Sequence, residues 1–410
     1  MSSEAIPLPS FIAVESALLE TTEFLARELS CPGSAAPQWI DFEWRVAEAV
    51  AALHGISALL SDALRWTGPD HWQAFLAEQK TQTLLRHQVI AHLLSRVDSR
   101  ARDAGIGLVA LKGAALLELG VYQPGMRPMG DIDLLADGAS IDVSTQLLTT
   151  LGYVESFETW RHTVFIPCDR PRMVSFGEHV GNPINIELHS RIAERLPVSE
   201  TDITSLALPK PLHAGLNPYP SVAALMRHLL LHAAGNMRAR ALRLIQLHDI
   251  ALLADRMSSA DWQELLNMRA GSRGLWWAFP PLTLTARYYP AAIPASVVDT
   301  VAQACPLWLR QVSRQHELAD VSWSKVRIQA LPGIEWSTSP REALLFAISR
   351  IWPSRTALAE LSHATTAQPS LTVVPWYGLS HASRILRWIF SRPPRVQTIG
   401  SVRAALGHGP

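Results

Sequence analysis

The spacing of apolar residues predicts that the first quarter of the chain is helical. Apolar side chains recur every three or four positions, the period of an amphipathic helix, over residues 11–29, 42–66 and 71–103. Clusters of proline and glycine separate these stretches. We therefore predict an N-terminal helical region over residues 1–105, and none of its residues forms a pattern typical of catalysis.

The pattern changes to short strands over residues 106–210. An apolar run at residues 107–111 predicts a buried strand, followed by a short helix at 114–119 and a second strand at 131–135. Alternating polar and apolar residues at 184–189 predict a later strand. The other elements predicted here are a helix at 141–151 and strands at 163–167 and 173–176.

Helical periodicity returns after a linker that contains four prolines. We predict a C-terminal helical domain over residues 211–390 and a basic, flexible tail over 391–410. The tail is consistent with a loose end of an amphipathic helix or with a docking arm for an anionic partner or a membrane surface. The predicted fold class is α+β, with a small mixed sheet flanked by helical regions.

Two carboxylates in the second predicted strand are the first candidates for chemistry. Side chains alternate along a strand, so Asp131 and Asp133 face the same way, about 7 Å apart, while Ile132 points into the core. Carboxylates on one face repel each other unless positive charge lies between them. Mg²⁺ is the natural occupant because hard cations prefer oxygen ligands.

The turn before these acids has the features of a phosphate site. Gly113 permits close approach of a ligand to the backbone, and the helix that follows presents free N–H groups. Lys112 and Arg127 add positive charge. A phosphate site beside paired carboxylates is typical of metal-assisted transfer of a phosphate-bearing group.

The strand at 184–189 offers a third acid. Alternation places Asn185, Glu187 and His189 on one face. A lone glutamate on a half-exposed strand is usually only solvated. His189 either orients Glu187 or contacts a phosphate, or it is an ordinary surface histidine.

The residues from Lys112-Gly113 through Arg127 to Asp131-Ile132-Asp133 resemble the nucleotidyltransferase fold of the DNA polymerase β superfamily. They are most similar to a bacterial group described as uncharacterised nucleotidyltransferases. That superfamily combines a glycine-containing strand–helix turn, a D-x-D strand and a third carboxylate on a later strand. The resemblance covers roughly residues 106–190.

This resemblance implies roles for particular residues. Asp131, Asp133 and Glu187 would be the catalytic carboxylates and would bind Mg²⁺ or Mn²⁺, with a nucleoside triphosphate as co-substrate. In one departure from the family pattern, Ala114 replaces the serine that usually follows the glycine, so a phosphate-binding hydroxyl is missing. Lys112 would compensate for it.

Polar residues of the C-terminal helices offer further candidates. Arg238 and Arg243 belong to an arginine cluster that suits triphosphate binding inside a transferase and is a solvated helix face otherwise. Asp249 interrupts an apolar helix, where it either lines a cleft or caps a helix or pairs with an arginine. His228 and His232 share a helical face, but the HExxH pattern of many zinc enzymes is absent.

Composition narrows the class of protein. Lys+Arg and Asp+Glu both number 36, so no excess of positive charge favours nucleic acid. Three cysteines without metal-binding spacing suit a reducing compartment. The N-terminal residues lack the features of a signal peptide, and no uncharged apolar run reaches the roughly 18 residues of a membrane helix. We therefore expect a soluble cytoplasmic protein without a transmembrane segment.

Three classes of function are compatible with these features. The first is a transferase that moves a nucleotidyl group to a small molecule, a peptide or a protein, as in peptide tailoring. The second is a non-catalytic nucleotide-binding or peptide-binding module on the same fold, and the third is a toxin-like enzyme that modifies a tRNA end. Three acids favour chemistry over binding, and helical flanks without a basic groove favour a small or peptidic acceptor over tRNA.

Overall fold

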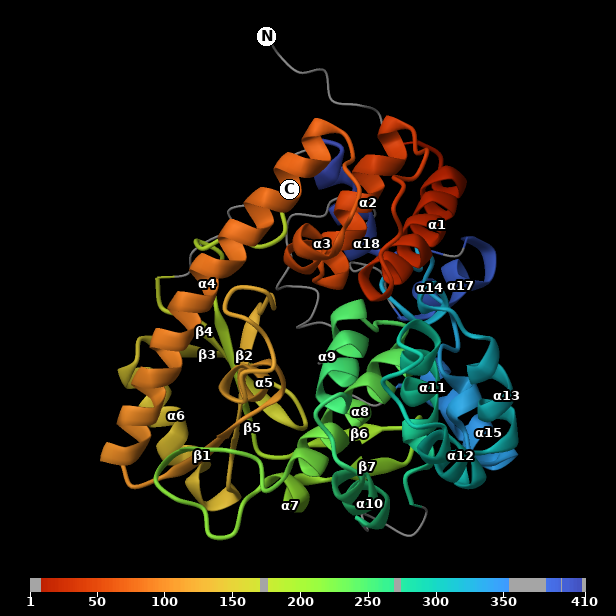
Figure 1. Cartoon of the computed structure of the whole chain (residues 1–410). Helices are drawn as coiled ribbons and strands as arrows, with labels where there is room; N and C mark the ends of the chain where they lie inside the picture. Colours follow the sequence, from red (N-terminus) through yellow and green to blue (C-terminus); the bar gives the residue numbers. More distant parts are fainter. Residues whose placement is uncertain (1–8, 170–175, 269–273, 354–380, 392, 408–410) are drawn as a thin grey trace.

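The computed structural model describes residues 9–169, 176–268, 274–353, 381–391 and 393–407. Helices from both ends of the chain surround one six-stranded sheet (Figure 1). The predicted α+β class, with a small mixed sheet between two helical regions, is confirmed.

The sheet has the strand order β3-β4-β5-β2-β1-β8. Its members are β1 (Gly107–Ala110), β2 (Asp131–Ala136), β3 (Tyr153–Glu158), β4 (His162–Pro167), β5 (Asn185–His189) and β8 (Gly215–Asn217). Strand β2 pairs antiparallel with β1 and parallel with β5, so the sheet is mixed. A separate two-stranded sheet contains β6 (Ala193–Arg195) and β7 (Glu200–Asp202).

The edge strand β8 lies inside the stretch that the sequence predicts as a proline-rich linker. It pairs parallel with β1, and its Asn217 side-chain amide donates to the carbonyl of Leu108 at 3.2 Å. A strand of three residues is too short to show an alternating pattern, so this strand could not be predicted from the sequence. The strand predicted at 173–176 falls almost entirely outside the described residues.

The N-terminal region contains α1 (Phe11–Ser30), α2 (Asp41–His54), α3 (Ser57–Ala63) and α4 (Asp70–Asp103). The single helix predicted over 42–66 is broken at Gly55, whose φ of +67° ends α2 in the left-handed region that glycine favours. A Cβ at Gly55 would also collide with the Arg243 guanidinium. Helix α4 runs along the sheet in Figure 1.

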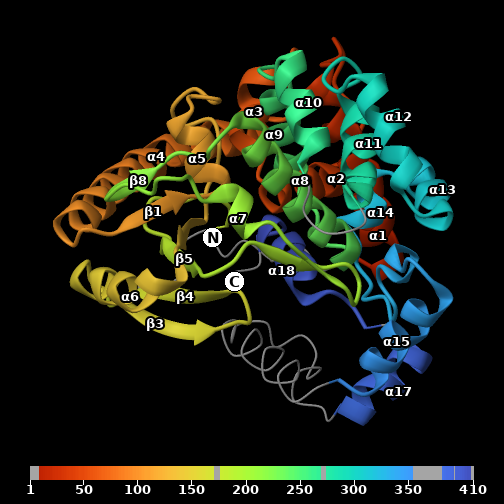
Figure 2. The same ribbon diagram turned by 90° about the horizontal axis from the view of Figure 1, so that it is seen from below.

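The two faces of the sheet pack against different cores. One face buries Ile132, Leu134 and Ile186 in the smaller core, which includes residues of α4 and α6 (Ile141–Thr150). On the opposite face, which carries the acids, Val109 and Leu135 pack in the larger core with residues of α5 (Lys112–Glu118), α8 (Val222–Ala239) and α9 (Leu244–Ala254). Figure 2 shows α8 and α9 beside the sheet. The site therefore lies between the sheet and the C-terminal helices.

The remaining described α-helices complete the C-terminal part. They are α7 (Thr204–Ala207), α10 (Ser259–Asn267), α11 (Phe279–Tyr288), α12 (Ala295–Ala304), α13 (Leu307–Gln315), α14 (Leu318–Val321), α15 (Pro340–Ile351), α17 (His381–Ser391) and α18 (Val396–Ala405). No single helix among the described residues has the length and apolar character to cross a membrane; only the bent pair α2 and α3 meets that test together.

Helix α18 differs from the flexible tail that the sequence suggested for residues 391–410. Its Val396, Ile399 and Val402 are buried, and the helix packs against α2 near the other end of the chain (Figure 1). The Thr398 hydroxyl donates to the Trp323 carbonyl at 2.7 Å. Burial of this apolar face orders a segment whose charge alone indicated a solvated tail.

A buried histidine connects the N-terminal and C-terminal helices. His54 Nδ1 accepts from the Leu244 N–H at 3.0 Å, which leaves Nε2 to donate to Ser324 Oγ at 2.8 Å. Burial, and then the charge of Arg243, lowers the pKa of His54 to about 3. The folded protein therefore holds this imidazole neutral.

We expect His54 to make the fold sensitive to acid. The unfolded chain takes up a proton below a pKa of about 6.5, whereas folded His54 stays neutral, so stability falls as the pH drops below 6.5. Between pH 7.5 and 5 the wild-type protein should lose about 2 kcal/mol more than His54→Gln. Urea unfolding at both pH values measures this, and parallel pH curves for the two proteins would contradict it.

Candidate active site

Parallel pairing of β2 with β5 brings the acids together. Asp133 lies opposite Glu187, and Asp131 lies opposite Asn185 in the same register. Asp133 is buried, Glu187 is partly buried, and Asp131 lies at the exposed beginning of β2. The three carboxylates share one sheet face: Asp131 and Asp133 are two residues apart on β2, and Glu187 is the register partner of Asp133 on β5.

Lys112 supplies positive charge to this acidic group. Its Nζ donates to Asp133 Oδ1 at 2.6 Å. Its backbone has a φ of +47°, which is uncommon for a residue with a Cβ. The Lys112 N–H donates to the Tyr219 hydroxyl, which in turn lies 2.6 Å from His228 Nδ1. The side chain and the backbone N–H of Lys112 thus both make contacts that hold this turn in place.

The two aspartates of the D-x-D strand have opposite electrostatics. Burial disfavours the Asp133 carboxylate, but Lys112 and then His189 outweigh it and hold its pKa well below the usual value. Asp131 reaches solvent, yet surrounding protein still desolvates its carboxylate. This desolvation, followed by repulsion from Asp133 and Glu187, raises the pKa of Asp131 to about 6. Asp133 is therefore the carboxylate that stays ionised, with Lys112 beside it as its counter-ion.

Two histidines lie next to the acids. His189 Nε2 is 2.9 Å from Asp133 Oδ1 and 3.4 Å from Glu187 Oε2. His162 begins β4 directly opposite His189, and its Nε2 is 3.8 Å from Glu187 Oε2. Burial lowers the pKa of His162 to about 4, whereas hydrogen bonds to Asp133 and Glu187 overcome burial and raise the pKa of His189.

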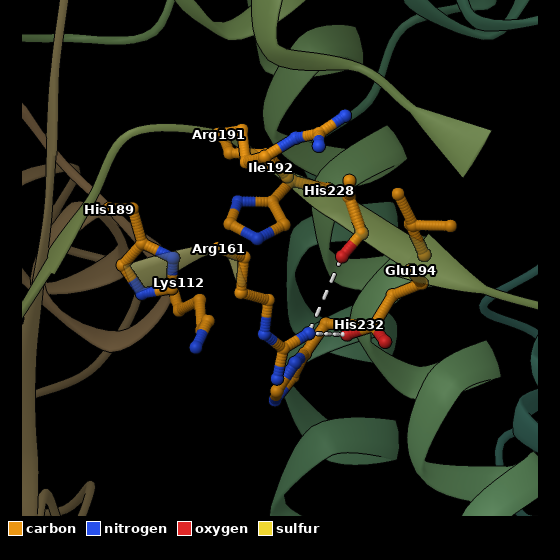
Figure 3. A pocket seen from close by; sticks show the side chains of 10 residues that line it. Lys112, Arg161, His189, Arg191, Ile192, Glu194, His228 and His232 are labelled. Carbon is orange, nitrogen blue, oxygen red and sulfur yellow. Dashed lines mark hydrogen bonds and ion pairs between the residues drawn. The ribbon is translucent and has the colours of Figure 1, made fainter. Parts of the chain in front are cut away.

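A small pocket opens beside this group (Figure 3). Lys112 and His189 line it on the sheet side, and His228 and His232 line it from α8. Its other lining residues are Arg161, Arg191, Ile192, Ala193, Glu194 and Leu231. An ion pair joins Arg161 to Glu194 across the pocket wall (Figure 3). The pocket and the acids therefore share Lys112 and His189.

The structure pairs Arg127 with Asp249. Arg127 Nε and Nη2 donate to the two Asp249 carboxylate oxygens at 2.8 and 2.7 Å, and the Tyr122 hydroxyl adds a 2.6 Å bond. Burial opposes the guanidinium charge, but Asp249 outweighs it and raises the pKa of Arg127. Of the alternatives for Asp249, the structure shows pairing with an arginine. A Cβ at Gly113 would strike the Arg127 guanidinium, so this glycine makes room for Arg127.

Of the other sequence candidates, Arg243 lies near the acids, whereas the charged neighbours of Arg238 are Glu194, Arg161, Arg195 and Glu335. Arg243 donates to the Leu53 carbonyl at 2.9 Å, and its charge favours the ionised form of Asp131. Arg238 lies at the end of α8, where burial lowers its pKa and Glu194 is its main electrostatic partner. Ala114 is buried in α5, and its N–H donates to the Leu111 carbonyl at 3.1 Å.

Sequence reasoning missed several residues of this site. His162 is next to Glu187 only because β4 pairs with β5, and Arg161 reaches the pocket from the turn before β4. Tyr219 reaches Lys112 from the segment between β8 and α8. The one local signal for His162 is its position directly before a predicted strand. Its contact with Glu187 could not be predicted, because it depends on the register between the two strands.

Comparison with protein families identifies the class. Residues 41–288 match the family of uncharacterised nucleotidyltransferases, and because the match spans more than half of the chain, the protein belongs to this family. The resemblance drawn from the motif is confirmed. A comparison with curated proteins found no match, and a comparison with solved structures found none.

We expect the two aspartates to respond oppositely to removal of their charge. In metal-free buffer at pH 7.5, Asp133→Asn should lower the unfolding free energy by about 3 kcal/mol, because it leaves buried Lys112 without its closest counter-ion. Asp131→Asn should leave stability unchanged or raise it, because it removes repulsion. Urea unfolding in a chelator measures both values. Equal effects would contradict the assignment of Lys112 to Asp133.

A second prediction concerns Arg127 and Asp249. Asp249→Asn should cost about 3 kcal/mol, since it leaves a buried guanidinium uncompensated, whereas Tyr122→Phe should cost about 1 kcal/mol. The double variant Arg127→Met/Asp249→Leu should recover part of the loss. Chemical unfolding compares the three variants. Similar losses for Asp249→Asn and Tyr122→Phe would show that the ion pair contributes little.

Proposed function

We propose that the protein transfers a nucleotidyl group, or a related phosphate-bearing group, from a nucleoside triphosphate to a small-molecule, peptide or protein acceptor, with Mg²⁺ or Mn²⁺. The observation that carries this proposal is the register of β2 and β5, which gathers Asp131, Asp133 and Glu187 beside the Lys112 turn. Membership of the nucleotidyltransferase family supports the reaction class.

The donor set fits a hard divalent ion. Asp131, Asp133 and Glu187 offer carboxylate oxygens on one face, and positive charge from Lys112 already balances Asp133. A divalent ion bound there would neutralise phosphate charge and lower the pKa of an attacking hydroxyl. Asp131, Asp133 and Glu187 are the residues that would bind this ion.

The chain's own residues would orient the two substrates. We place the donor phosphates at the Lys112–Gly113–Ala114 turn, where Lys112 supplies charge in place of the missing serine hydroxyl. Arg127 and Asp249 would hold this turn from the side of α9, with Arg243 as a further positive group and the His189 imidazole as a hydrogen-bonding group near the donor. Glu187 is partly exposed and would accept the proton of the acceptor hydroxyl.

The pocket beside Lys112 and His189 is the proposed entry for the acceptor. It adjoins the acids, and cationic Arg161 and Arg191 line it with the α8 histidines. Its small size and the absence of a net positive charge on the chain favour a small molecule or a peptide end over a tRNA end.

A specific observation supports a second candidate, a nucleotide-binding or peptide-binding module without transfer. Lys112 and His189 both contact Asp133 Oδ1, so this carboxylate has cationic or hydrogen-bonding partners within the protein itself. Such a site would bind the phosphates of a nucleotide through Lys112, without a metal ion on Asp133.

Both candidates are separated by one experiment. Each nucleoside triphosphate is added with Mg²⁺ or Mn²⁺ to the wild-type protein, with and without a mixture of small peptides and metabolites. We expect a rise in melting temperature for one nucleotide and release of pyrophosphate when an acceptor is present. Glu187→Gln should bind the nucleotide but release pyrophosphate about 100-fold more slowly, because a ligand of the ion and the proton acceptor are both lost.

The outcomes decide between transfer and binding. A thermal shift without pyrophosphate or labelled product in any mixture would support the binding module. No response to any nucleotide with either ion would contradict both candidates. His71→Gln, which lies in the N-terminal helices and leaves the acids and the pocket in place, serves as the control for non-specific loss.

A further inference from the structure

His162 is a buried imidazole that lacks a normal hydrogen bond. Only 9% of the residue is exposed, and its Nδ1 is buried without a hydrogen-bond partner among the described residues. Its Nε2 faces Glu187 Oε2 at 3.8 Å, which is too long for a hydrogen bond. Buried polar groups in native proteins are almost always satisfied, so a ring in this state points to a ligand.

The ring belongs to a compact group of three donors. Ligand atoms of His162, Glu187 and His189 all lie within 4.8 Å of one another. The histidines are directly opposite each other on β4 and β5, with ring centres 4.8 Å apart, so two paired strands fix their separation. Donors around one zinc ion lie roughly 3.3 Å apart, which small side-chain rotations would reach from this arrangement.

The chemistry of the donors selects a class of ion. Mg²⁺ prefers oxygen ligands and retains its waters, whereas Mn²⁺, Co²⁺ and Zn²⁺ accept imidazole nitrogen. Two histidines and one carboxylate with open positions form a ligand set used by catalytic transition-metal sites. This set contains two nitrogens for one oxygen, unlike the all-oxygen set of the three acids.

We propose that His162, Glu187 and His189 bind a divalent transition-metal ion of the Mn²⁺, Co²⁺ or Zn²⁺ class, next to the Asp131–Asp133 pair. This inference deepens the proposed function, on which it rests for the role of the ion, since Glu187 and His189 belong to both sites. The His189 contact with Asp133 Oδ1 places the two sites side by side.

The first test uses the unaltered protein. The full-length chain, freed of metal and loaded with one equivalent of Mn²⁺, is examined by pulsed electron paramagnetic resonance. We expect couplings from imidazole ¹⁴N of two histidines. A signal without nitrogen coupling would overturn the proposal, and this result does not depend on the folding of any variant.

The second test uses variants and Co²⁺. His162→Gln and His189→Gln should each weaken Co²⁺ binding by at least about tenfold and change its visible absorption, measured by titration in the metal-free protein. His71→Gln is the matched control, because His71 also contacts two carboxylates, Glu48 and Asp41, but lies in the N-terminal helices. Co²⁺ binding at wild-type strength by folded His162→Gln would overturn the proposal.

The same titrations separate this inference from the proposed function. Histidine-dependent Co²⁺ binding in a protein that releases no pyrophosphate with any nucleotide would support the metal site and contradict transfer. Pyrophosphate release that His162→Gln retains in full, with nitrogen-free Mn²⁺ spectra, would support transfer and contradict the metal site.

Discussion

The ion pair between Lys112 and Asp133 is the interaction on which the rest of the site depends. Register between β2 and β5 places Asp133 beside Glu187, and Asp131 lies two residues away, so three carboxylates crowd one face. A buried carboxylate without a counter-charge costs several kcal/mol. The 2.6 Å contact from Lys112 offsets part of that cost, and the positive φ of Lys112 is the backbone conformation in which the contact is made.

The sequence predicted the features that are encoded locally. Alternation located β2 and β5 and placed Ile132 in the core, where it is fully buried. It could not locate β8, because a strand of three residues carries no periodic signal, nor the order of α18, because its burial depends on α2. Both features arise from partners distant in sequence.

The same limit applies to the charged residues of the site. Arg127 and Asp249 are separated by 122 positions, and either residue alone has the chemistry of a ligand contact. Two hydrogen bonds join Arg127 to Asp249 next to Gly113, and no local sequence pattern predicts this tertiary contact. His162 shows the converse, since a histidine without any local motif becomes a neighbour of Glu187 only through the pairing of β4 with β5.

These contacts also explain why the functional unit is larger than the sheet. Helix α9 holds Arg127 through Asp249, and α8 supplies the two histidines of the pocket wall. Tyr219 links the Lys112 turn to α8, while His54 links α2 to the start of α9. The family match at residues 41–288 begins at α2 and ends with α11, so it includes each of these supports. A strained lysine turn and a crowded acidic face require such support, because the sheet alone would leave both without their partners.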